Sequence, residues 1–563
     1  MRHTEVYSES GVIEVQSKSM LKTEEENGYS YFGNAFYALS RSHNQGMLIG
    51  SSYAFQQQDI AKELVLDAAA MAFNFDDRGV IDGGKMATAD GLGGSEEDQD
   101  ESKSIAKISQ YACAYFVKSR TNTDTALFNI AANSVNLALP RTTAQKYDST
   151  CALATTQFDY QQNGTYRVEL ANVGDTCIVV LDADGKVKYQ VSATQSFRGF
   201  GVWSPNSVQM LTASPNNLAE ICQKEILTLN QGDIILSMSD GIWGELEVEV
   251  AKKASESKAL KLAPDALSSL IAGNTQQSIC QLLAGIVGAA MANSLQKKNT
   301  LVKIVNGLEK INFPPEIQFI DQVMTYLTKN NLKTLADKLY QLLFENGEGD
   351  GMGYFKEKIG LIPLTYVLQD LKNRTLGDCS TINAVRLPYR LDELIRAFIR
   401  YPKNQLTLLT EISGYSRDEL MISIQRLANE RTITQPRMKA ANQQFGLVFE
   451  PAILEQTYQL LNHYLAINQI LKTAVNKSDA LKQVDAYLDN VPSNLLKHFL
   501  VLIKPKIKVE HRLFGMLRKS DEYTQYQAII KKCSDRIDNE SNLAPNSQSS
   551  NNGQGATNQP NSF

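Results

Sequence analysis

The sequence predicts an α+β protein of several domains, with a strand-rich N-terminal region, a helical insertion and an all-α C-terminal domain. Three observations predict this organisation. The 563 residues exceed what one hydrophobic core holds, which is roughly 250 to 300 residues. Short β-rich runs between Gly and Asp-Gly turns fill residues 1–250, as in antiparallel sheets. Beyond them, apolar residues recur at spacings of three and four, which is typical of helices.

Within residues 1–250 the expected strands lie in runs such as MLIGSSYAF, MAFNF, YRVELANV, CIVVLDADGKVKYQV and GDIILSMSDG. Asp184-Gly185 separates two alternating runs and predicts a hairpin, because this dipeptide adopts the positive φ angles of tight hairpin turns. Residues 251–372 are expected to be a helical insertion. Strand character returns at residues 373–390, and helices resume at 391–537. The polar residues 538–563 are expected to be disordered, because they have little apolar surface to bury.

Composition excludes several classes of function. The net charge of −5 provides no chain-wide basic field for nucleic acid. The seven Cys are scattered, which argues against a disulfide framework or a thiolate zinc site, and none has an Arg six positions later, as cysteine phosphatases need. The sequence has no apolar signal or membrane segment, so a soluble cytoplasmic protein is expected, with secretion into a host-cell cytosol left open. Of five His, none lies between His43 and His463, so chemistry in this region must proceed without imidazole.

Aspartates at turns after apolar strands are therefore the main candidates for chemistry. Asp90 lies in KMATADGLGG, Asp240 in DIILSMSDGIWGEL and Asp378 in NRTLGDCSTINAVRLP. The glycines that follow the first two allow close backbone approach. Clustered carboxylates suit hard cations such as Mg²⁺ or Mn²⁺, and a pair of such ions activates water for phosphoryl transfer. An isolated Asp-Gly pair, by contrast, commonly marks only a turn.

Four blocks in order strengthen the chemical interpretation. ATADGLGG, STCALATTQF with VELANVGDTCIVVLDADGKV, IILSMSDGIWGEL and GDCSTINAVRLP together resemble the motifs of the metal-dependent type 2C serine/threonine protein phosphatases. The resemblance covers roughly residues 45–250 and 373–388. It implies a four-layer α-β-β-α sandwich of two antiparallel sheets flanked by helices.

The resemblance also implies a ligand set for two Mn²⁺ or Mg²⁺ ions. Asp90 and the Gly91 carbonyl would bind the pair, Asp240 and Asp378 would complete it, and Asp175 in the Gly-Asp-Thr motif could support a third ion. Two departures accompany the match. Gly244 replaces an Asp of many members, and Leu92 replaces a common His, so the leaving-group proton would come from water.

Two positions stay open. The acid from the first strand is either Asp59, after GMLIGSSYAFQQQ, or Asp77, in MAFNFDDRG. The phosphate-binding Arg expected five residues earlier is absent in both cases, with Arg78 as a possible substitute. The closing Asp is Asp378 or, in a competing register within LQKKNTLVKIV, is replaced by Lys298. Asp378 is favoured because a protonated Lys cannot bind a metal ion.

The C-terminal helices have the rhythm of a helix-turn-helix, but a charged bundle that binds a protein partner is favoured over a nucleic-acid reader. The function expected from this sequence is metal-dependent hydrolysis of phosphoserine or phosphothreonine in a phosphoprotein. The alternative is a catalytically dead scaffold that binds a partner through its helices. The large helical additions are similar to those of bacterial effectors that act in host cells.

Overall fold

The computed structural model describes about two thirds of the chain, and every structural statement below refers to these residues. They are 4–8, 11–13, 25–26, 29–30, 40–42, 45–47, 50–56, 66–91, 99–137, 151–174, 176–192, 222–243, 248–250, 260–262, 282, 286, 290, 299–340, 362–365, 367–368, 371, 379–433, 449–507 and 521–543.

The larger sheet has seven strands, all joined by antiparallel pairing except the parallel pair β1 and β8. In spatial order they are β14 (Gln223–Asn230), β11 (Thr165–Val173), β10 (Cys151–Tyr160), β9 (Ile81–Gly91), β8 (Ala68–Phe75), β1 (Thr4–Ser8) and β2 (Gly11–Ile13). The hairpin of β8 and β9 lies near the middle of this sheet, so both strands are paired on each side.

The second sheet has five strands paired antiparallel. They are β13 (Val187–Ser192), β12 (Cys177–Leu181), β15 (Ile234–Met238), β18 (Cys379–Arg386) and β7 (Gly50–Gln56). The predicted hairpin joins β12 and β13, with Gly185 at φ +85°. Short two-stranded sheets are formed by β3 (Glu25–Glu26), β4 (Tyr29–Ser30), β5 (Ser40–Ser42), β6 (Gln45–Met47), β16 (Val248–Val250) and β17 (Leu260–Leu262).

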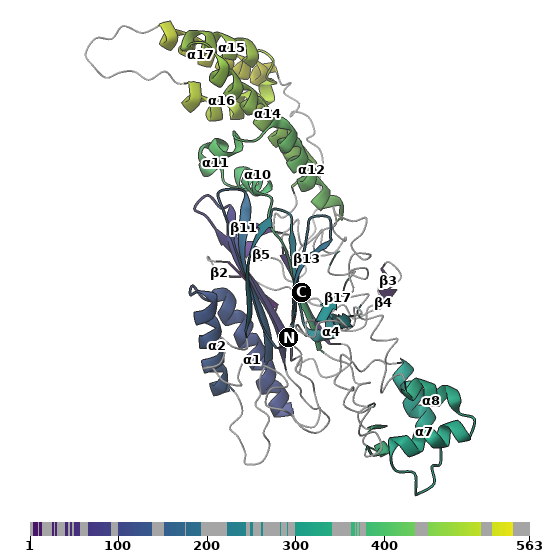
Figure 1. Ribbon diagram of the computed structural model, residues 1–563. Helices are drawn as coiled ribbons and strands as arrows, with labels where there is room; N and C mark the ends of the chain where they lie inside the picture. The colour runs from purple at the N-terminus through teal and green to yellow at the C-terminus, as the bar shows by residue number, and fades with distance from the viewer. Residues whose placement is uncertain are drawn as a thin grey trace, which may run out of the picture. The chain divides into compact units, whose positions relative to one another are not determined.

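The two sheets face each other across an apolar core that includes Met71, Phe158, Ile178 and Ile382. The outer face of the larger sheet is rich in Ala and packs against α1 (Gln99–Lys118) and α2 (Thr123–Leu137) (Figure 1). Small side chains on the strands let a helix approach closely, and α1 fills the space with larger groups such as Phe116. This is the predicted α+β sandwich of two sheets flanked by helices.

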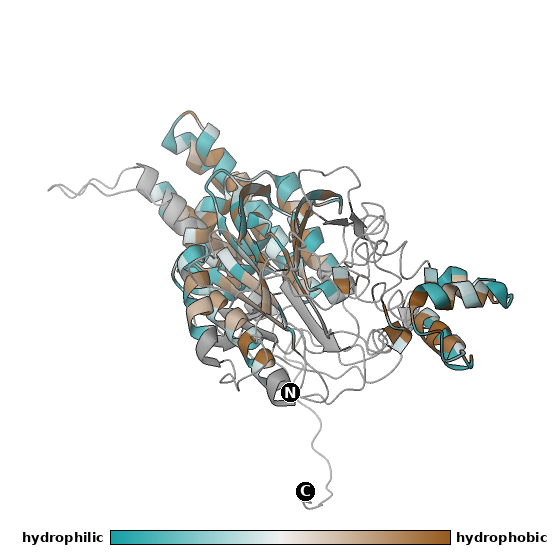
Figure 2. Cartoon of the chain, turned by 60° about the horizontal axis from the view of Figure 1, so that its bottom comes forward, coloured by the Kyte–Doolittle hydropathy of each residue, from teal (hydrophilic) through white to brown (hydrophobic). Residues whose placement is uncertain are grey.

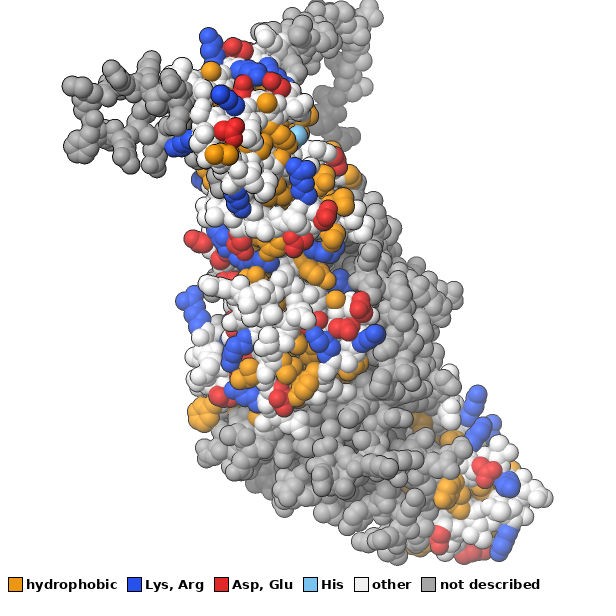
Figure 3. All heavy atoms as spheres, turned by 45° about the horizontal axis from the view of Figure 1, so that its top comes forward, with side chains coloured by type: hydrophobic (Ala, Val, Ile, Leu, Met, Phe, Trp, Pro, Cys, Tyr) orange, Lys and Arg blue, Asp and Glu red, His pale blue; other side chains and the backbone are white. Residues whose placement is uncertain are grey.

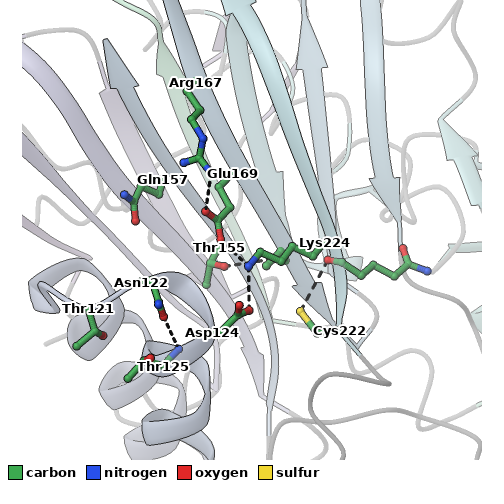
Figure 4. A network of polar contacts seen from close by, with 12 residues as sticks. Thr121, Asn122, Asp124, Thr125, Thr155, Gln157, Arg167, Glu169, Cys222 and Lys224 are labelled. Carbon is green, nitrogen blue, oxygen red and sulfur yellow. Dashed lines mark hydrogen bonds and ion pairs between the residues drawn. The ribbon is translucent and has the colours of Figure 1, made fainter. Parts of the chain in front are cut away.

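The outer face of the larger sheet also carries a network of charged groups (Figure 4). The Lys224 ammonium on β14 lies 2.9 Å from carboxylate oxygens of both Glu169 on β11 and Asp124 on α2. Arg167 lies 3.7 Å from Glu169 on its other side. Because opposite charges alternate here, the network stabilises the contact between α2 and the sheet edge and needs no further ion.

The predicted insertion contains helices with their own apolar core. Residues 299–309 are helical, followed by α7 (Ile320–Lys329) and α8 (Lys333–Tyr340). Their buried side chains, among them Ile304, Val323 and Leu339, form one cluster, and Figure 2 shows the resulting apolar and polar faces of these helices. The strand β17 also falls within the range 251–372, so the insertion is not purely helical.

The C-terminal region is helical. Its elements are α10 (Arg390–Arg400), a 3₁₀ turn η5 (Pro402–Asn404), α11 (Gln405–Ile412), α12 (Arg417–Ile433), α14 (Pro451–Thr473), α15 (Lys477–Leu488), α16 (Ser493–Ile507) and α17 (Asp521–Leu543). Contacts divide the chain into two compact units, residues 1–396 with 426–449, and residues 397–425 with 450–563. On the face drawn in Figure 3, acidic and basic side chains are interspersed over these helices.

Helix α17 corrects one predicted boundary. The tail was expected to begin at residue 538, yet the helix continues to Leu543. Extending an existing helix adds a hydrogen bond for each residue fixed, so a polar sequence can continue it for a turn or more. In the described part of the chain, no helix has both the length and the apolar character needed to cross a membrane.

Candidate active site

Two aspartates meet at one end of the β8–β9 hairpin. Asp90 is the penultimate residue of β9, and Asp67 immediately precedes β8. Ala68 pairs with Ala89, so Asp67 and Asp90 are the next residues along the two strands. Side chains alternate between sheet faces, and Met71 and Met86 point into the core between the sheets. Asp67 and Asp90 share that face, so both carboxylates point toward the second sheet.

Asp240 approaches from the second sheet. It follows β15 and begins the one-turn helix α4 (Asp240–Trp243), whose last three residues are buried. The Asp240 backbone N–H donates a hydrogen bond to Asp90 Oδ2 at 3.2 Å. The sandwich therefore brings together, at one end, two of the aspartates that the sequence singled out, although they are separated by 150 positions.

Asp67 has the most unusual environment of the three. Its side chain is 3% exposed, and Oδ2 is buried with no hydrogen-bond partner among the described residues. Oδ1 accepts a long hydrogen bond, 3.4 Å, from the Gly91 N–H. The pKa of the Asp67 carboxyl is raised to about 7, mainly by burial and in part by the negative charge of Asp240, against the opposing effect of polar groups of Ser239, Gly91 and Asp90.

Gly91 is required by close packing. A Cβ atom at this position would lie 2.6 Å from the Ile105 side chain and 2.7 Å from the Leu66 carbonyl oxygen. Both neighbours are fixed by packing, so even Ala would displace the backbone that carries Asp90. The Asp-Gly dipeptide here is thus part of a buried strand end and not of an exposed turn.

Asp77 lies at the wrong end of the hairpin for this group. It is exposed, in the turn that joins β8 to β9, whereas Asp90 lies near the far end of the eleven-residue β9. Nine residues of strand separate the two ends by about 30 Å. The spacing of 13 residues that suggested Asp77 reflects the length of β9, and the structure does not bring Asp77 to Asp90. Arg78 is also at that turn, where it binds Asp76.

Other predicted ligands lie outside the described residues: Asp59, Asp175 and Asp378. On either side of Asp175, Asn172 Nδ2 donates to the Thr176 carbonyl at 2.9 Å and Gly174 has φ +94°. Strand β18 begins directly after Asp378 and pairs with β15, the strand that leads to Asp240. The competing register required a strand just after Lys298, but residues 299–309 are helical.

Asp67 is not among the predicted ligands, because the predictions concerned acids that follow strands and Asp67 precedes one. In an antiparallel hairpin, the start of one strand lies beside the end of its partner. The partner of an acid at the end of β9 must therefore precede β8. The segment LVLDAAAMAFNF contains this signal, a single acid at the start of a continuous apolar run.

The chemistry of these donors fits a divalent cation. Asp67, Asp90 and Asp240 lie at the same end of the sandwich, where carboxylates disfavour one another's charge unless a positive charge is added. Asp67 Oδ2 is an oxygen ligand of the kind Mg²⁺ and Mn²⁺ take. Within the described residues, no three His, Cys, Asp or Glu side chains are close enough together to hold an ion by themselves. The described aspartates can therefore supply only part of a ligand set.

The two mainly antiparallel sheets, flanked by helices and with aspartates from both sheets at one end, form the sandwich that the sequence predicted. Solved structures similar to this chain include two phosphatases. An S. agalactiae serine/threonine phosphatase matches with a TM-score of 0.30 and 12% identity over 43% of this chain and 93% of its own. The catalytic domain of the phosphatase PstP with two manganese ions matches with a TM-score of 0.25 and 15% identity over 43% and 92%.

A relative in sequence is more specific. The chain is 34% identical over 530 residues to the phosphocholine hydrolase Lem3 of Legionella pneumophila, and the match covers 92% of each protein. The chain belongs to the family of this hydrolase. No general family model matches the sequence. The relationship includes the helical regions as well as the sandwich, because it extends over nearly the whole length of both proteins.

Proposed function

We propose that this chain is a metal-dependent hydrolase that cleaves a phosphate ester carrying a phosphocholine group. The observation that carries the proposal is the convergence of Asp67, Asp90 and Asp240 from two sheets, with a buried carboxylate oxygen that has no described hydrogen-bond partner. Membership of the phosphocholine hydrolase family supports the substrate class.

Asp67, Asp90 and Asp240 would hold the metal pair, with the Gly91 carbonyl and Asp378 added from the resemblance to type 2C phosphatases. Two Mn²⁺ or Mg²⁺ ions, when bound, supply Lewis-acid stabilisation of phosphoryl oxygens and lower the pKa of water. The chain itself fixes the ligands. The Asp240 N–H donates to the Asp90 carboxylate and so orients it, and the packing around Gly91 leaves no room for a Cβ atom beside Asp90. Asp59 and a third ion at Asp175 stay predictions.

Asp67 also changes the assessment of the missing phosphate-binding Arg. Counted from Asp67, the position five residues earlier is Lys62, which lies outside the described residues. We propose that this Lys supplies the positive charge for the substrate phosphate. The absence of an Arg was one argument for a dead scaffold, and a Lys at this position weakens that argument.

Three substrates separate the possible reactions. p-Nitrophenyl phosphorylcholine tests release of a phosphocholine group, phosphocholine itself tests cleavage to choline and phosphate, and a phosphoserine or phosphothreonine peptide tests the reaction expected from the type 2C resemblance. We expect hydrolysis of a phosphocholine ester in Mn²⁺ and its loss in EDTA. Asp240→Ala, purified in the same way, is the control for contaminating phosphatases.

Each outcome has a distinct meaning. Turnover of the phosphopeptide alone would support a protein serine/threonine phosphatase instead. If none of the three is hydrolysed and calorimetry detects no Mn²⁺ binding, the chain is the scaffold alternative, with a partner bound through its helices. Action in a host-cell cytosol and a protein partner for the C-terminal helices also stay predictions.

A further inference from the structure

A small group of buried polar side chains lies between the two sheets, directly beneath the aspartates. Asn383 on β18 and Thr88 on β9 are both fully buried, and Ser237 on β15 is 1% exposed. The surrounding core consists of Met, Ile, Val, Leu and Phe side chains. Burying polar groups in such a core costs free energy unless they are hydrogen-bonded. The side chains of Asn383 and Thr88 are hydrogen-bonded, whereas the Ser237 hydroxyl has no hydrogen-bond partner among the described residues and Ser237 contributes its backbone carbonyl.

These residues connect three strands of two sheets. Asn383 Nδ2 donates to the Ala87 carbonyl at 2.6 Å and to Thr88 Oγ1 at 2.9 Å. The Thr88 hydroxyl in turn donates to the Ser237 carbonyl at 3.4 Å. Asn383 and Ser237 are also direct partners in the pairing of β18 with β15. We name Asn383, Thr88 and Ser237 the inter-sheet clamp.

Two members of the clamp precede the candidate ligands by only two or three residues in the sequence. Thr88 precedes Asp90 by two residues on β9, and Ser237 precedes Asp240 by three residues. A second contact lies closer to the site, where the Thr381 N–H on β18 donates to Oγ of Ser239, the residue that follows β15, at 2.8 Å. Because apolar packing between sheets is non-directional, these hydrogen bonds are what prevent one sheet from sliding over the other at this point.

We propose that Asn383 and Thr88 are positioning residues, which hold β9 against β15 so that Asp90 and Asp240 converge on the same metal pair. The proposal rests on the proposed function, because it assumes that these aspartates bind metal. Neither residue touches substrate. Groups that orient metal ligands commonly change metal affinity by about 10-fold to 100-fold when they are removed.

The test uses substitutions that change one hydroxyl or one amide in the full-length protein. Thr88→Val removes the hydroxyl with little change of shape, and Thr88→Ser restores it. Thr156→Val is a matched control, because Thr156 is equally buried on the neighbouring strand β10 and its Oγ1 has no hydrogen-bond partner among the described residues. Asn383→Ala changes the clamp from the other sheet, because it removes the two hydrogen bonds that Asn383 donates to Ala87 and Thr88.

The measurement is the Kd for Mn²⁺ by calorimetry, with the melting temperature recorded in EDTA and in Mn²⁺. We expect Thr88→Val and Asn383→Ala to raise the Kd about 10-fold, and Thr88→Ser and Thr156→Val to stay within about twofold. If Asn383→Ala does not fold, the two Thr88 variants decide the result.

The two hypotheses fail in different ways. If Thr88→Val lowers the melting temperature in EDTA but leaves the Mn²⁺ Kd unchanged, the clamp is only structural and the positioning role is wrong. If wild-type protein binds Mn²⁺ and hydrolyses none of the three substrates, the proposed function fails while the Kd values still decide the positioning role. If wild-type protein binds no Mn²⁺, both proposals are overturned.

Discussion

Asp67 and Asp76 flank the same strand, β8, and their surroundings are opposite. Asp76 accepts hydrogen bonds from the backbone N–H groups of Arg78 and Val80, and its Oδ2 lies 2.7 Å from the Arg78 guanidinium and 3.7 Å from that of Arg390. Asp67, at the other end, is more deeply buried and lies beside further carboxylates.

The difference separates a structural carboxylate from a functional one. Asp76 has cations and amides that compensate its charge, so it stabilises the hairpin turn and the first turn of α10. The charged form of Asp67 is compensated only in part, by polar groups of Ser239, Gly91 and Asp90, and its burial costs stability in the folded protein. Clusters of this kind persist at functional sites, where a ligand supplies the missing charge. Burial and charge balance distinguish the two more clearly than either position in the sequence.

The largest effect is expected from Asp90. We expect Asp90→Asn to lower kcat/KM for the phosphocholine ester by at least about 10³-fold at saturating Mn²⁺, because it removes a charged ligand at the point where both sheets meet. Steady-state kinetics with the chromogenic ester measure this. A loss smaller than about tenfold in a folded protein would show that Asp90 does not bind the catalytic metal ions.

Asp67→Asn should have the next largest effect, of about 10²-fold on kcat/KM. Unlike most substitutions of buried groups, it should not lower the melting temperature of the protein in EDTA, because Asn keeps the shape and removes a buried negative charge that lies near Asp240. Differential scanning calorimetry with and without Mn²⁺ measures both states. A clear loss of stability in EDTA together with unchanged kinetics would make Asp67 a structural residue like Asp76.

Asp76→Asn provides the reverse pattern. It weakens the contacts with Arg78 and Arg390, which are partly buried, so we expect a loss of about 1–3 kcal/mol in the free energy of unfolding. The kinetic constants should change less than twofold. The neighbouring Asp77→Asn is the control, since Asp77 is exposed and surface substitutions usually change stability by less than about 0.5 kcal/mol. Urea unfolding of the wild type, Asp76→Asn and Asp77→Asn measures their free energies of unfolding and decides between these outcomes.

Much of the fold could be predicted from the sequence, because period-two runs and Asp-Gly turns are local signals. The runs around Ala72, Val180 and Ile235 all form strands. Aspartates at strand ends likewise identified Asp90 and Asp240, which the structure brings together. In these cases the residue and the element that places it are adjacent in sequence.

Asp67 and the clamp could not be predicted in the same way, because their meaning depends on pairing between strands. Asp67 becomes a neighbour of Asp90 only through the register of β8 against β9. Asn383 bonds to Thr88 across 295 positions, and nothing near Asn383 in the sequence indicates a polar partner. The exposed Asp77 was a plausible ligand by its spacing from Asp90 alone. In the structure, β9 runs away from the turn that contains Asp77 and carries Asp90 to the opposite end of the hairpin.

The smallest expected effect tests, at a residue that is not a candidate metal ligand, the rule that burial and a nearby like charge disfavour the charged form of a side chain. His463 in α14 accepts or donates one hydrogen bond with the Tyr487 hydroxyl at 3.0 Å. Burial lowers the pKa of His463, and the positive charge of Arg417 lowers it further, just as burial and a like charge raise the pKa of Asp67. For both residues, the folded protein favours the neutral form more than the unfolded chain does.

The sign of the pH dependence follows from this shift. The unfolded chain, where the pKa of His is about 6.5, takes up the proton more readily than the folded protein, so the contribution of His463 to stability is present above that pH and is lost as the pH falls below it. We expect Arg417→Gln to move the pKa of His463 upward, measured by NMR of protein with ¹³C-labelled histidine. The change should be a few tenths of a unit, because exposed charges are screened. A downward movement would show that the rule used to interpret Asp67 does not hold in this protein.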